Sequence, residues 1–538
     1  MIWLTERSGW QSNGREGGKR FMKRKMVSIL LAGTMITSIL TGCQSTGSAS
    51  GGNGSPEEAA AENSAASGDA ASVLKDGVDT EITIVFPGSS SAPASLAAVE
   101  EGINGIISET VDAHVKFNIL EWGVYMEQKN LMLSSGEDID IIFIIGASDV
   151  QNSAKSGQIL DISGYMDEYA GDAVEKMGTY IDGCYVGDAL YGWPTYHEYA
   201  QGGGLVCSTA ILEETGYAAE DITTWEDVEA VCAKVHELHP DMDVLVPPEA
   251  QSGMMKYYWG GVFDKIVTDM VGVYNDGRDG LTAHNIYSTD EFMQTAQKAY
   301  EWNQNGWFIA DSNTITETRQ TFIKAGTAFG YIGLVHPGTM TQEMTNTGMD
   351  ITTIPINEQG CGTNDVAAYQ YCVSAATDSP EKSLAVMNLI YSNADIQNYI
   401  RYGIEGSDYE MKSEGVAGYP EGVGADNAGW VNELWLTGNG SIAYAWETDP
   451  DGIWERYADY NNNAVFSPAY GFTYDANGVK TEITAVQNVL DKYLALIYSG
   501  LRDPAETVEA FNQELSAAGM DVIVADVQEQ LDAWNASK

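Results

Sequence analysis

Residues 140–145, with the sequence Asp-Ile-Ile-Phe-Ile-Ile, form a short and nearly unbroken apolar run. Such a run is typical of a strand in a parallel sheet that is covered on both faces. Upstream, residues 81–86 and 114–120 have strand patterns, and residues 95–108 and 125–134 have helical ones. This alternation predicts an open α/β sheet, and ligands of such sheets bind beyond the carboxyl ends of the strands.

The strand–helix pattern starts again after residues 189–195, an extended segment in which Gly192 and Pro194 flank Trp193. We interpret this segment as a crossing between two domains. The predicted elements beyond it are strands at 205–207 and 245–246 and helices at 224–238 and 288–302. About 460 residues follow the N-terminal region, which is enough for two domains with substantial cores.

The N-terminal region resembles a bacterial lipoprotein signal peptide. A cationic cluster at residues 19–25 precedes the largely apolar segment 27–40, which has the length of a signal-peptide core. Leu40-Thr41-Gly42-Cys43 resembles the lipobox, in which the cysteine sulfur receives a diacylglycerol and the chain is cut before it. We therefore predict a signal peptide over residues 1–43 with lipidation at Cys43, rather than a buried thiol after a hydrophobic helix.

Met22 opens directly onto Lys-Arg-Lys, so residues 1–21 are interpreted as an extension ahead of the true start. Residues 44–77 consist mostly of Gly, Ser, Ala, Glu and Asn, and have too little apolar surface to offset the entropy lost on folding. We predict a flexible tether there. Since no later apolar run reaches membrane-spanning length, the expected location is the extracellular face of the cell membrane, with a soluble body held by a lipid anchor.

The chain is strongly acidic, with 27 Lys and Arg against 77 Asp and Glu. Residues 1–43 hold seven of the basic residues and two of the acidic ones, so the remainder has a formal net charge of about −55. This charge repels nucleic acids and anionic lipid headgroups, and it disfavours polyanionic ligands. It favours a neutral ligand, although the same charge also serves solubility.

Five cysteines follow Cys43, namely Cys184, Cys207, Cys232, Cys361 and Cys372. None forms a Cys-x-x-Cys pair, and the odd number argues against a full disulfide framework, so we expect small core residues. Whether Cys361 and Cys372 form a bridge is left open. Residues 276–280 and 475–478 are similar to fragments of calcium loops but lack the full pattern, so no metal or other cofactor is expected.

Several motifs in the second half of the chain resemble those of a known family. Those similar to the extracellular solute-binding proteins of ABC importers are Thr-Ala-Phe-Gly-Tyr-Ile at 327–332, His-Pro-Gly at 336–338 and residues 379–388. Those similar to the subgroup with a DUF3502 C-terminal region are Tyr-Gly-Ile-Glu-Gly at 402–406, Gly-Phe-Thr-Tyr-Asp at 471–475, and residues 518–521 and 528–534. This subgroup consists of lipoproteins usually associated with carbohydrate uptake, and the resemblance covers about residues 78–538.

The resemblance implies a two-lobed, periplasmic-binding-protein-like α/β fold with a ligand cleft between the lobes. The implied crossings between lobes lie near residues 190–195, 310–315 and 371–376. The expected lobes are residues 78–190 plus 315–372 for the first, and residues 191–314 plus 373–538, including the DUF3502-like region, for the second. Ser407-Asp408 stands where the subgroup commonly has Lys-His, so either ligand specificity differs or this position is a structural turn.

A cleft that binds sugars needs aromatic rings for the C–H faces of the sugar and polar groups for its hydroxyls. Topology places Trp122 and Trp193 at the cleft, whereas Trp225 is interpreted as core; Trp435 and Trp454 are further candidates. The alternative role for the other aromatic residues is packing in the core. Asp149 could instead cap a helix, and His336 could instead be a polar turn residue. The predicted ligand-binding residues are Ser89, Ser90, Trp122, Asp149, Tyr191, Trp193, Tyr196, Tyr258, Trp259, His336 and Trp446.

We therefore predict a monomeric, non-catalytic substrate-binding lipoprotein that captures a neutral oligosaccharide by hinge closure and delivers it to the permease subunits of an ABC transporter. No Gly-x-Ser-x-Gly, His-Glu-x-x-His or phosphate-binding Gly-x-x-x-x-Gly-Lys-Ser/Thr motif is present in the sequence. A binding protein for a peptide or another small solute is the main alternative. A secreted glycoside hydrolase is the second, less favoured alternative. Carboxylate pairs do not support it, because so many acidic residues produce such pairs by chance.

Overall fold

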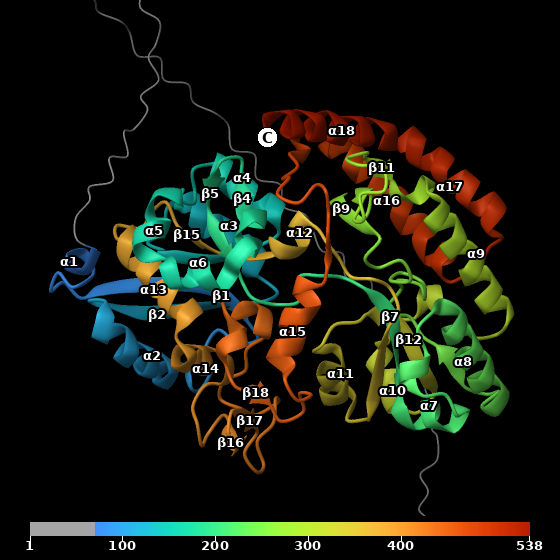
Figure 1. The fold of residues 1–538 in the computed structure, drawn as a ribbon, viewed down its shortest axis with the longest axis horizontal. Coiled ribbons are helices and arrows are strands. Elements are labelled where there is room, and N and C mark those ends of the chain that lie inside the picture. The colour runs from blue at the N-terminus through green and yellow to red at the C-terminus, as the bar shows by residue number, and fades with distance from the viewer. Residues whose placement is uncertain (1–69) are drawn as a thin grey trace, which may run out of the picture. The chain divides into compact units, whose positions relative to one another are not determined.

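The computed structural model describes residues 70–538 as two α/β lobes, each built around its own sheet (Figure 1). The sheet of the first lobe has five strands in the order β2-β1-β3-β15-β6, and the central sheet of the second lobe has four strands in the order β13-β7-β12-β8. The predicted α/β class is therefore confirmed.

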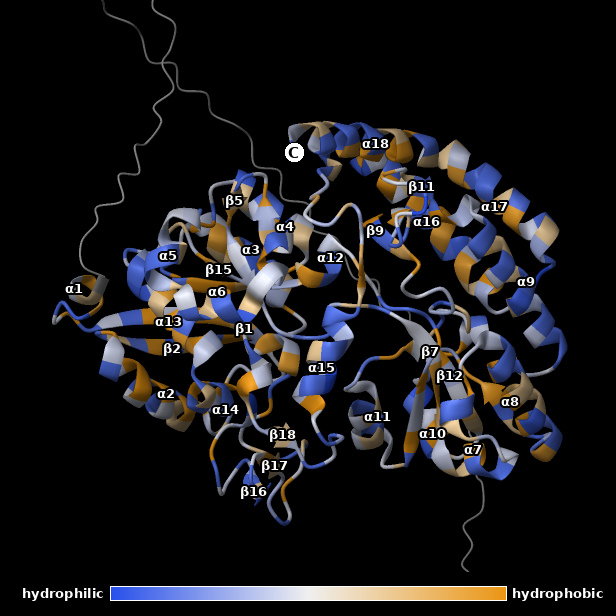
Figure 2. Cartoon of the chain, in the orientation of Figure 1, coloured by the Kyte–Doolittle hydropathy of each residue, from blue (hydrophilic) through white to orange (hydrophobic). Residues whose placement is uncertain are grey.

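The first lobe contains the strand–helix series that was expected from the sequence. β1 (Thr80–Gly88) pairs in parallel with both β2 (Ala113–Glu121) and β3 (Ile141–Ile145), and the connecting helices are α2 (Leu96–Thr110) and α3 (Tyr125–Ser135). The first four residues of β3 are buried, as expected for a strand covered on both faces. In Figure 2, α2 carries both hydrophobic and hydrophilic positions, because only its Val99, Ile103 and Ile107 side is buried.

Two separate parts of the chain complete the first lobe. β15 pairs antiparallel with both β3 and β6, which joins the later part of the chain to the earlier one. The remaining elements are α1 (Ala70–Leu74), α4 (Ala147–Lys155), α5 (Met166–Tyr169), α6 (Gly171–Met177), β4 (Tyr185–Val186), β5 (Ala189–Leu190), β6 (Gly192–Pro194), β15 (Tyr369–Val373), α13 (Pro380–Ser392), α14 (Ala394–Tyr402), β16 (Glu410–Ser413), β17 (Val416–Gly418) and β18 (Ala445–Trp446).

The end of the predicted tether belongs to the first lobe. Residues 70–74 form α1, and the next residues are held by Lys382, which is only 4% exposed. The Nζ of Lys382 donates to Asp76 Oδ1 at 2.9 Å and to the Val78 carbonyl at 2.8 Å. Residues 70–77 are thus not a free linker, because the buried ammonium group requires these acceptors.

The second lobe is built around β7 (Gly203–Ser208), which pairs antiparallel with β12 (Ala328–Leu334) and with β13 (Ile351–Pro355). The predicted helix at 224–238 is α8 (Trp225–Leu238), which begins at a capping box formed by Thr224 and Asp227. The remaining elements are α7 (Thr209–Thr215), β8 (Asp243–Leu245), β9 (Phe263–Val267), β10 (Val271–Tyr274), β11 (His284–Asn285), α9 (Asp290–Gln304), α10 (Arg319–Lys324), α11 (Thr339–Thr347), α16 (Lys480–Tyr498), α17 (Pro504–Ala518) and α18 (Met520–Ser537).

The chain crosses between the lobes after β6, after β13 and after β18. The elements along these crossings are β14 (Gly360–Cys361), α12 (Thr363–Val366), α15 (Ile453–Asn462) and β19 (Val465–Phe466), and Figure 1 shows α12 and α15 between the two sheets. Near the end of α15, the Tyr460 hydroxyl donates to the Val335 carbonyl of the second lobe at 3.0 Å.

The expected division of the chain differs from this arrangement at two places. β12 and β13 lie within residues 315–372, which were expected in the first lobe, but they pair with β7 of the second. α13 and α14 were expected in the second lobe, but their buried apolar residues, apart from Tyr402, belong to the core of the first. Hydrophobic patterns predict that a segment is a strand or a helix, but only long-range pairing decides which sheet it joins.

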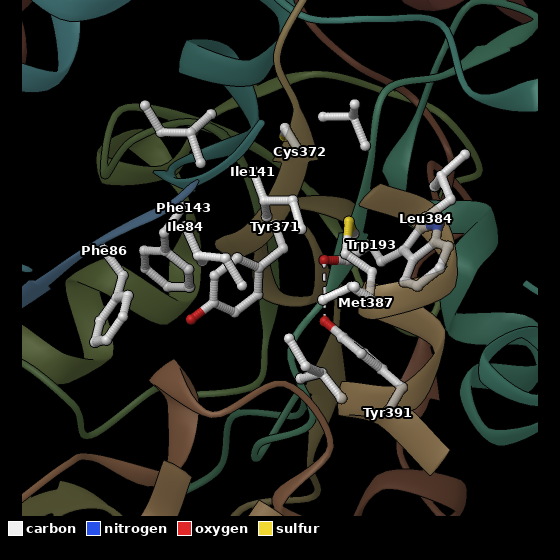
Figure 3. Packing of buried hydrophobic residues seen from close by; sticks show 14 of the residues in the cluster. Ile84, Phe86, Ile141, Phe143, Trp193, Tyr371, Cys372, Leu384, Met387 and Tyr391 are labelled. Carbon is white, nitrogen blue, oxygen red and sulfur yellow. Dashed lines mark hydrogen bonds between the residues drawn. The ribbon is translucent and has the colours of Figure 1, made fainter. Parts of the chain in front are cut away.

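Each lobe has its own hydrophobic core. Figure 3 shows part of the first one, where Trp193, Met387 and Tyr391 lie together beside the strand residues Ile141 and Tyr371. The five cysteines of the described residues are all buried free thiols, so Cys361 and Cys372 do not form a bridge. Burial raises the pKa of these thiols, which makes them unreactive core residues.

Two carboxyl groups lie beside the crossing segments, that of the buried Asp264 and that of the half-buried Asp365. Asp264, on β9, is 1% exposed, and its Oδ2 has no hydrogen-bond partner among the described residues. Asp365, on α12, accepts hydrogen bonds from the backbone N–H of Gly362 at 2.8 Å and from Nε2 of Gln201 at 2.6 Å. Burial raises the pKa of Asp264 to about 6, and burial together with the nearby Asp264 raises the pKa of Asp365 to about 7.

Asp264→Asn is expected to stabilise the protein more at pH 8 than at pH 4. In the unfolded chain both carboxyl groups titrate near pH 4, so between about pH 4 and pH 7 the folded protein binds more protons than the unfolded chain. Stability from this pair is therefore present at low pH and is lost as the pH rises through the folded pKa values. We expect the free energy of unfolding of the variant minus that of the wild type to be about 2 kcal/mol larger at pH 8 than at pH 4.

Urea denaturation of the wild type and the variant at both pH values measures this shift. Asp426→Asn, at an exposed position, is the matched control and should show no such shift. A difference between Asp264→Asn and the wild type that does not change with pH would contradict the titration of the buried pair.

Candidate ligand-binding cleft

A cavity of about 400 Å³ is lined by residues from both lobes and from α15. Its volume falls within the usual range for small-molecule sites, which is roughly 300–1,000 Å³. The crossing after β6 and the second lobe provide Glu198, His336, Gly338, Thr341, Gln342, Thr345 and Asn346. The first lobe and α15 provide Tyr369, Arg401, Tyr402, Asp408, Tyr419, Ala425, Trp430, Val431, Asn432, Glu433, Leu434, Trp435, Trp446, Asp449, Ile453, Trp454 and Tyr457.

The side of the cavity formed by the first lobe and α15 is aromatic. Tyr369 and Trp435 have ring centroids 4.5 Å apart, and the ring of Trp446 stacks on that of Tyr402 at 5.3 Å. The indole N–H of Trp454 donates to the Ala443 carbonyl at 2.9 Å. Backbone and ring contacts of this kind hold the rings in place, and Tyr369, Trp435, Trp446 and Trp454 remain partly exposed.

The side formed by the second lobe is polar. Besides His336 and Gly338, it consists of one face of α11, on which Thr341, Gln342, Thr345 and Asn346 lie at helical spacing. The last three of these residues are exposed. Amide and hydroxyl groups can both donate and accept hydrogen bonds, so this face offers both kinds of partner to a ligand.

The charges around the cavity are of both signs. Among the residues that line the cavity, Arg401 carries the positive charge. Its Nη1 donates to the Asn432 carbonyl, and its guanidinium lies 5.5 Å from the centroid of the Tyr402 ring. The carboxylates in the lining are those of Glu198, Asp408, Glu433 and Asp449. Burial raises the pKa of Asp449. This lining suits hydroxyl groups better than it suits an anion.

Asp408, the position that departs from the subgroup pattern, is a structural residue. It is 2% exposed, and its carboxylate accepts hydrogen bonds from the Ser95 hydroxyl at 3.0 Å and from the backbone N–H groups of Gly429 at 2.8 Å and Ile404 at 2.9 Å. It fixes the loop before Trp430 to the end of α14. The sequence left open whether this position changes ligand specificity or forms a structural turn, and these contacts agree with the turn.

Two of the predicted ligand-binding residues line the cavity, namely His336 and Trp446. The Nε2 of His336 lies 3.6 Å from Oε1 of Glu198, and the backbone N–H of His336 donates to the Thr339 hydroxyl at the start of α11. Trp435 and Trp454, which the sequence also indicated as candidates, line it as well.

Three further predicted residues lie at the ends of strands in the first lobe. Ser89 and Ser90 follow β1 and are exposed, and Trp122 follows β2 and is 40% exposed. All three lie outside the cavity lining, and the ring of Trp122 lies 5.4 Å from that of Trp435, which belongs to it.

Asp149 and Trp193 have other roles in the structure. Asp149, in the first turn of α4, forms an ion pair with the fully buried Lys129 of α3. Trp193 is fully buried in the first core, and its Nε1 donates to Sδ of Met166 at 3.3 Å. The extended segment does run beside a crossing as predicted, but strand pairing with β15 turns its tryptophan into the lobe.

The remaining predicted residues lie away from the cavity lining. Tyr191 is half-buried against the first core, and Tyr196 packs 6.0 Å from Tyr199 in the crossing after β6. Tyr258 stacks on the ring of Trp225 at 4.3 Å. Trp259 lines a different cavity, of about 210 Å³, in the second lobe.

The polar face of α11 and the residues Arg401 and Trp430 were not predicted. The segment 339–347 has several threonines and no strong apolar period, so its sequence did not mark it as a binding helix. Trp430 is buried, with its indole N–H donating to the Ile400 carbonyl at 2.8 Å. Only the pairing of β12 and β13 with β7 brings α11 to the cavity.

Within residues 70–538, no helix combines the length and the apolar character that crossing a bilayer requires. The same part of the chain contains no group of three or more His, Cys, Asp or Glu side chains arranged to hold a metal ion.

Known proteins resemble this chain along most of its length. A curated carbohydrate ABC transporter substrate-binding protein from Streptococcus pneumoniae serotype 4 is 24% identical over 461 residues, which are 83% of this chain and 89% of the relative. The crystal structure of NgtS, an N-glycan transport solute-binding protein from S. pneumoniae, matches with a TM-score of 0.74 and 22% identity, over 84% of this chain and 98% of that one.

Two further solved structures have the same fold. NgtS in complex with Man5GlcNAc matches with a TM-score of 0.61 and 22% identity, over 85% of this chain and 99% of that one. An extracellular solute-binding protein from Bifidobacterium longum subsp. infantis matches with a TM-score of 0.59 and 14% identity, over 84% of this chain and 98% of that one. The two-lobed architecture is thus that of known solute-binding proteins.

Family profiles match two regions of the chain. The domain of unknown function DUF3502 matches residues 468–536, which include α16, α17 and all but the last residue of α18, and this confirms the resemblance found in the C-terminal motifs. The profile of the bacterial extracellular solute-binding proteins matches residues 93–397. Since this match covers more than half of the chain, the protein belongs to the family of bacterial extracellular solute-binding proteins.

Proposed function

We propose that this protein is the substrate-binding component of an ABC importer and that it captures a neutral oligosaccharide in the cavity between its lobes. The observation that carries the proposal is the different chemistry of the two sides of the cavity. The first-lobe side presents aromatic rings such as Trp435 and Trp446, and the second-lobe side presents the amide and hydroxyl face of α11. A sugar has apolar C–H faces and a rim of hydroxyl groups, so it can use both sides at once.

The two sides of the cavity belong to different lobes, so a ligand bound between them can be captured when the lobes close. A ligand that touches both lobes binds the closed arrangement more tightly than an open one, and it shifts the equilibrium by that difference in affinity. The segments after β6, β13 and β18 are the places where such a hinge acts. No bond in the ligand needs to break, so we propose a receptor without catalytic activity.

Known relatives support the carbohydrate ligand. The curated relative is described as a carbohydrate ABC transporter substrate-binding protein, and NgtS has been crystallised with Man1GlcNAc and with Man5GlcNAc. The formal net charge of −50 for the whole chain also favours a neutral ligand over an anionic one. We expect a dissociation constant in the micromolar range or below.

We further propose that the receptor is a monomer, lipid-anchored through Cys43 on the extracellular face of the cell membrane, and that it delivers its ligand to membrane permease subunits. Cys43, the predicted signal peptide and most of the predicted tether lie outside the described residues. When the Cys43→Ser variant is expressed in the bacterium that makes the protein, it should be released into the medium, because the thiol that would receive the lipid is lost. Retention of the variant in the membrane fraction would overturn the anchor.

Trp446→Ala and Gln342→Ala test the two sides of the cavity separately. Each is expected to weaken the binding of Man5GlcNAc by about tenfold or more, because one removes a stacking surface and the other removes hydrogen bonds to hydroxyl groups. Isothermal titration calorimetry measures the affinity. Gln513→Ala, an exposed glutamine on α17, is the matched control for Gln342→Ala and should bind like the wild type.

The same measurements separate the proposed ligand class from its alternatives. Heat of binding from a peptide panel, with none from neutral glycans, would indicate that the ligand is a peptide and not an oligosaccharide. Release of shorter sugars during prolonged incubation of the protein with Man5GlcNAc would indicate a glycoside hydrolase. Recovery of the glycan intact is the expected result.

A further inference from the structure

The aromatic surface of the cavity continues beyond its lining. The Trp122 ring lies 5.4 Å from the ring of Trp435, which lines the cavity, and Trp122 is itself 40% exposed. Val431, also in the lining, is 46% exposed. The ring contacts of the cavity therefore continue from Trp435 to the exposed ring of Trp122.

Polar residues follow β1 next to Trp122, because β1 and β2 are parallel and end at the same level. Gly88 at the end of β1 is in register with Glu121 at the end of β2, and the Trp122 backbone N–H donates to the Gly88 carbonyl at 3.3 Å. This pairing places Ser89, Ser90 and Ser91 beside Glu121 and Trp122.

All of these side chains are exposed, and the Ser91 hydroxyl donates to Oε1 of Glu121 at 3.4 Å. The ends of β1 and β2 thus combine an exposed indole with hydroxyl groups and one carboxylate. This is the same pairing of an apolar face with hydrogen-bonding groups that the two sides of the cavity present.

We propose that Trp122, with Ser89, Ser90 and Glu121, forms an outer sugar subsite that binds a part of the oligosaccharide extending out of the cavity. The inference rests on the function proposed above and adds a preference for length. The inner cavity, at about 400 Å³, is near the small end of the range for ligand sites, so a larger glycan has to extend beyond it. A glycan that reaches Trp122 buries the exposed indole face and replaces water on the neighbouring hydroxyl and carboxylate groups.

Man1GlcNAc and Man5GlcNAc serve as the short and the long probe, with calorimetry on the full mature protein. Wild-type protein is expected to bind the long glycan more tightly. Trp122→Ala is expected to weaken binding of Man5GlcNAc by about tenfold and to leave the affinity for Man1GlcNAc within about twofold, because only the long glycan reaches the outer ring. Trp122→Phe should retain most of the affinity for the long glycan.

Tyr217→Ala is the matched control, since Tyr217 is 39% exposed in the second lobe and lies outside the cavity lining. Unchanged affinity of Trp122→Ala for both glycans would overturn the outer subsite while leaving the proposed function in place. An equal loss for both glycans would also overturn it, because Trp122 would then belong to the inner site. Failure of the wild type to bind either glycan would overturn the proposed ligand class and the outer subsite with it.

Discussion

Trp193→Ala is expected to lower the free energy of unfolding by about 4 kcal/mol. The indole is fully buried and lies 5.5 Å from the Tyr391 ring in an edge-on arrangement (Figure 3). Its N–H donates to Met166 Sδ. Truncation leaves a large cavity between the sheet and α13, and it removes the partner of the Met166 sulfur. Chemical denaturation followed by circular dichroism measures the loss.

Trp122→Ala is the matched control, because it removes the same side chain from a position that is 40% exposed. Its free energy of unfolding should fall by less than about 1 kcal/mol. If Trp193→Ala kept wild-type stability and instead lost affinity for Man5GlcNAc, Trp193 would line the ligand site as its sequence context first suggested, and the packing described here would be wrong.

Asp149→Ala is expected to lower the free energy of unfolding by about 3 kcal/mol. The carboxylate pairs with the ammonium group of Lys129, whose side chain is fully buried, whereas the Asp149 side chain is 26% exposed. Removing the carboxylate leaves a buried positive charge without its partner, which costs more than the pair contributes when intact. Denaturant unfolding of the variant and the wild type at pH 7 measures the difference.

The double variant Lys129→Met/Asp149→Ala tests the cause. Replacing the lysine by an apolar side chain of similar length removes the unpaired charge, so most of the lost stability should return. A double variant as unstable as Asp149→Ala alone would contradict the ion-pair explanation. Weakened glycan binding by Asp149→Ala at unchanged stability would restore Asp149 to the ligand site.

The secondary structure of the first lobe was predictable because its signals are local. The β1, β2 and β3 segments show strand patterns, and the α2 and α3 segments between them show helical ones, within short windows of sequence. Thr224 and Asp227 likewise marked the start of α8 through a capping box that involves only neighbouring residues. The division of the chain between the lobes was not predictable in this way, since β12 and β13 join β7 across more than a hundred residues of chain.

The candidate cleft shows the same contrast at the level of side chains. Trp122 follows a predicted strand and Trp193 lies in a predicted crossing, so the sequence indicates both as candidates for the cleft. The structure buries Trp193, whose strand β6 pairs with β15, and leaves Trp122 exposed beyond the end of β2.

The sequence by itself determined the α/β class, the positions of most early strands and helices, the acidic charge that favours a neutral ligand, and the family. Each of these depends on composition, short-range periodicity or contiguous motifs. The tertiary structure alone decided which aromatic rings face the cavity, and that the polar face of α11 lies opposite them. Such contacts join residues far apart in the chain, and they arise from strand pairing and packing that no local pattern encodes.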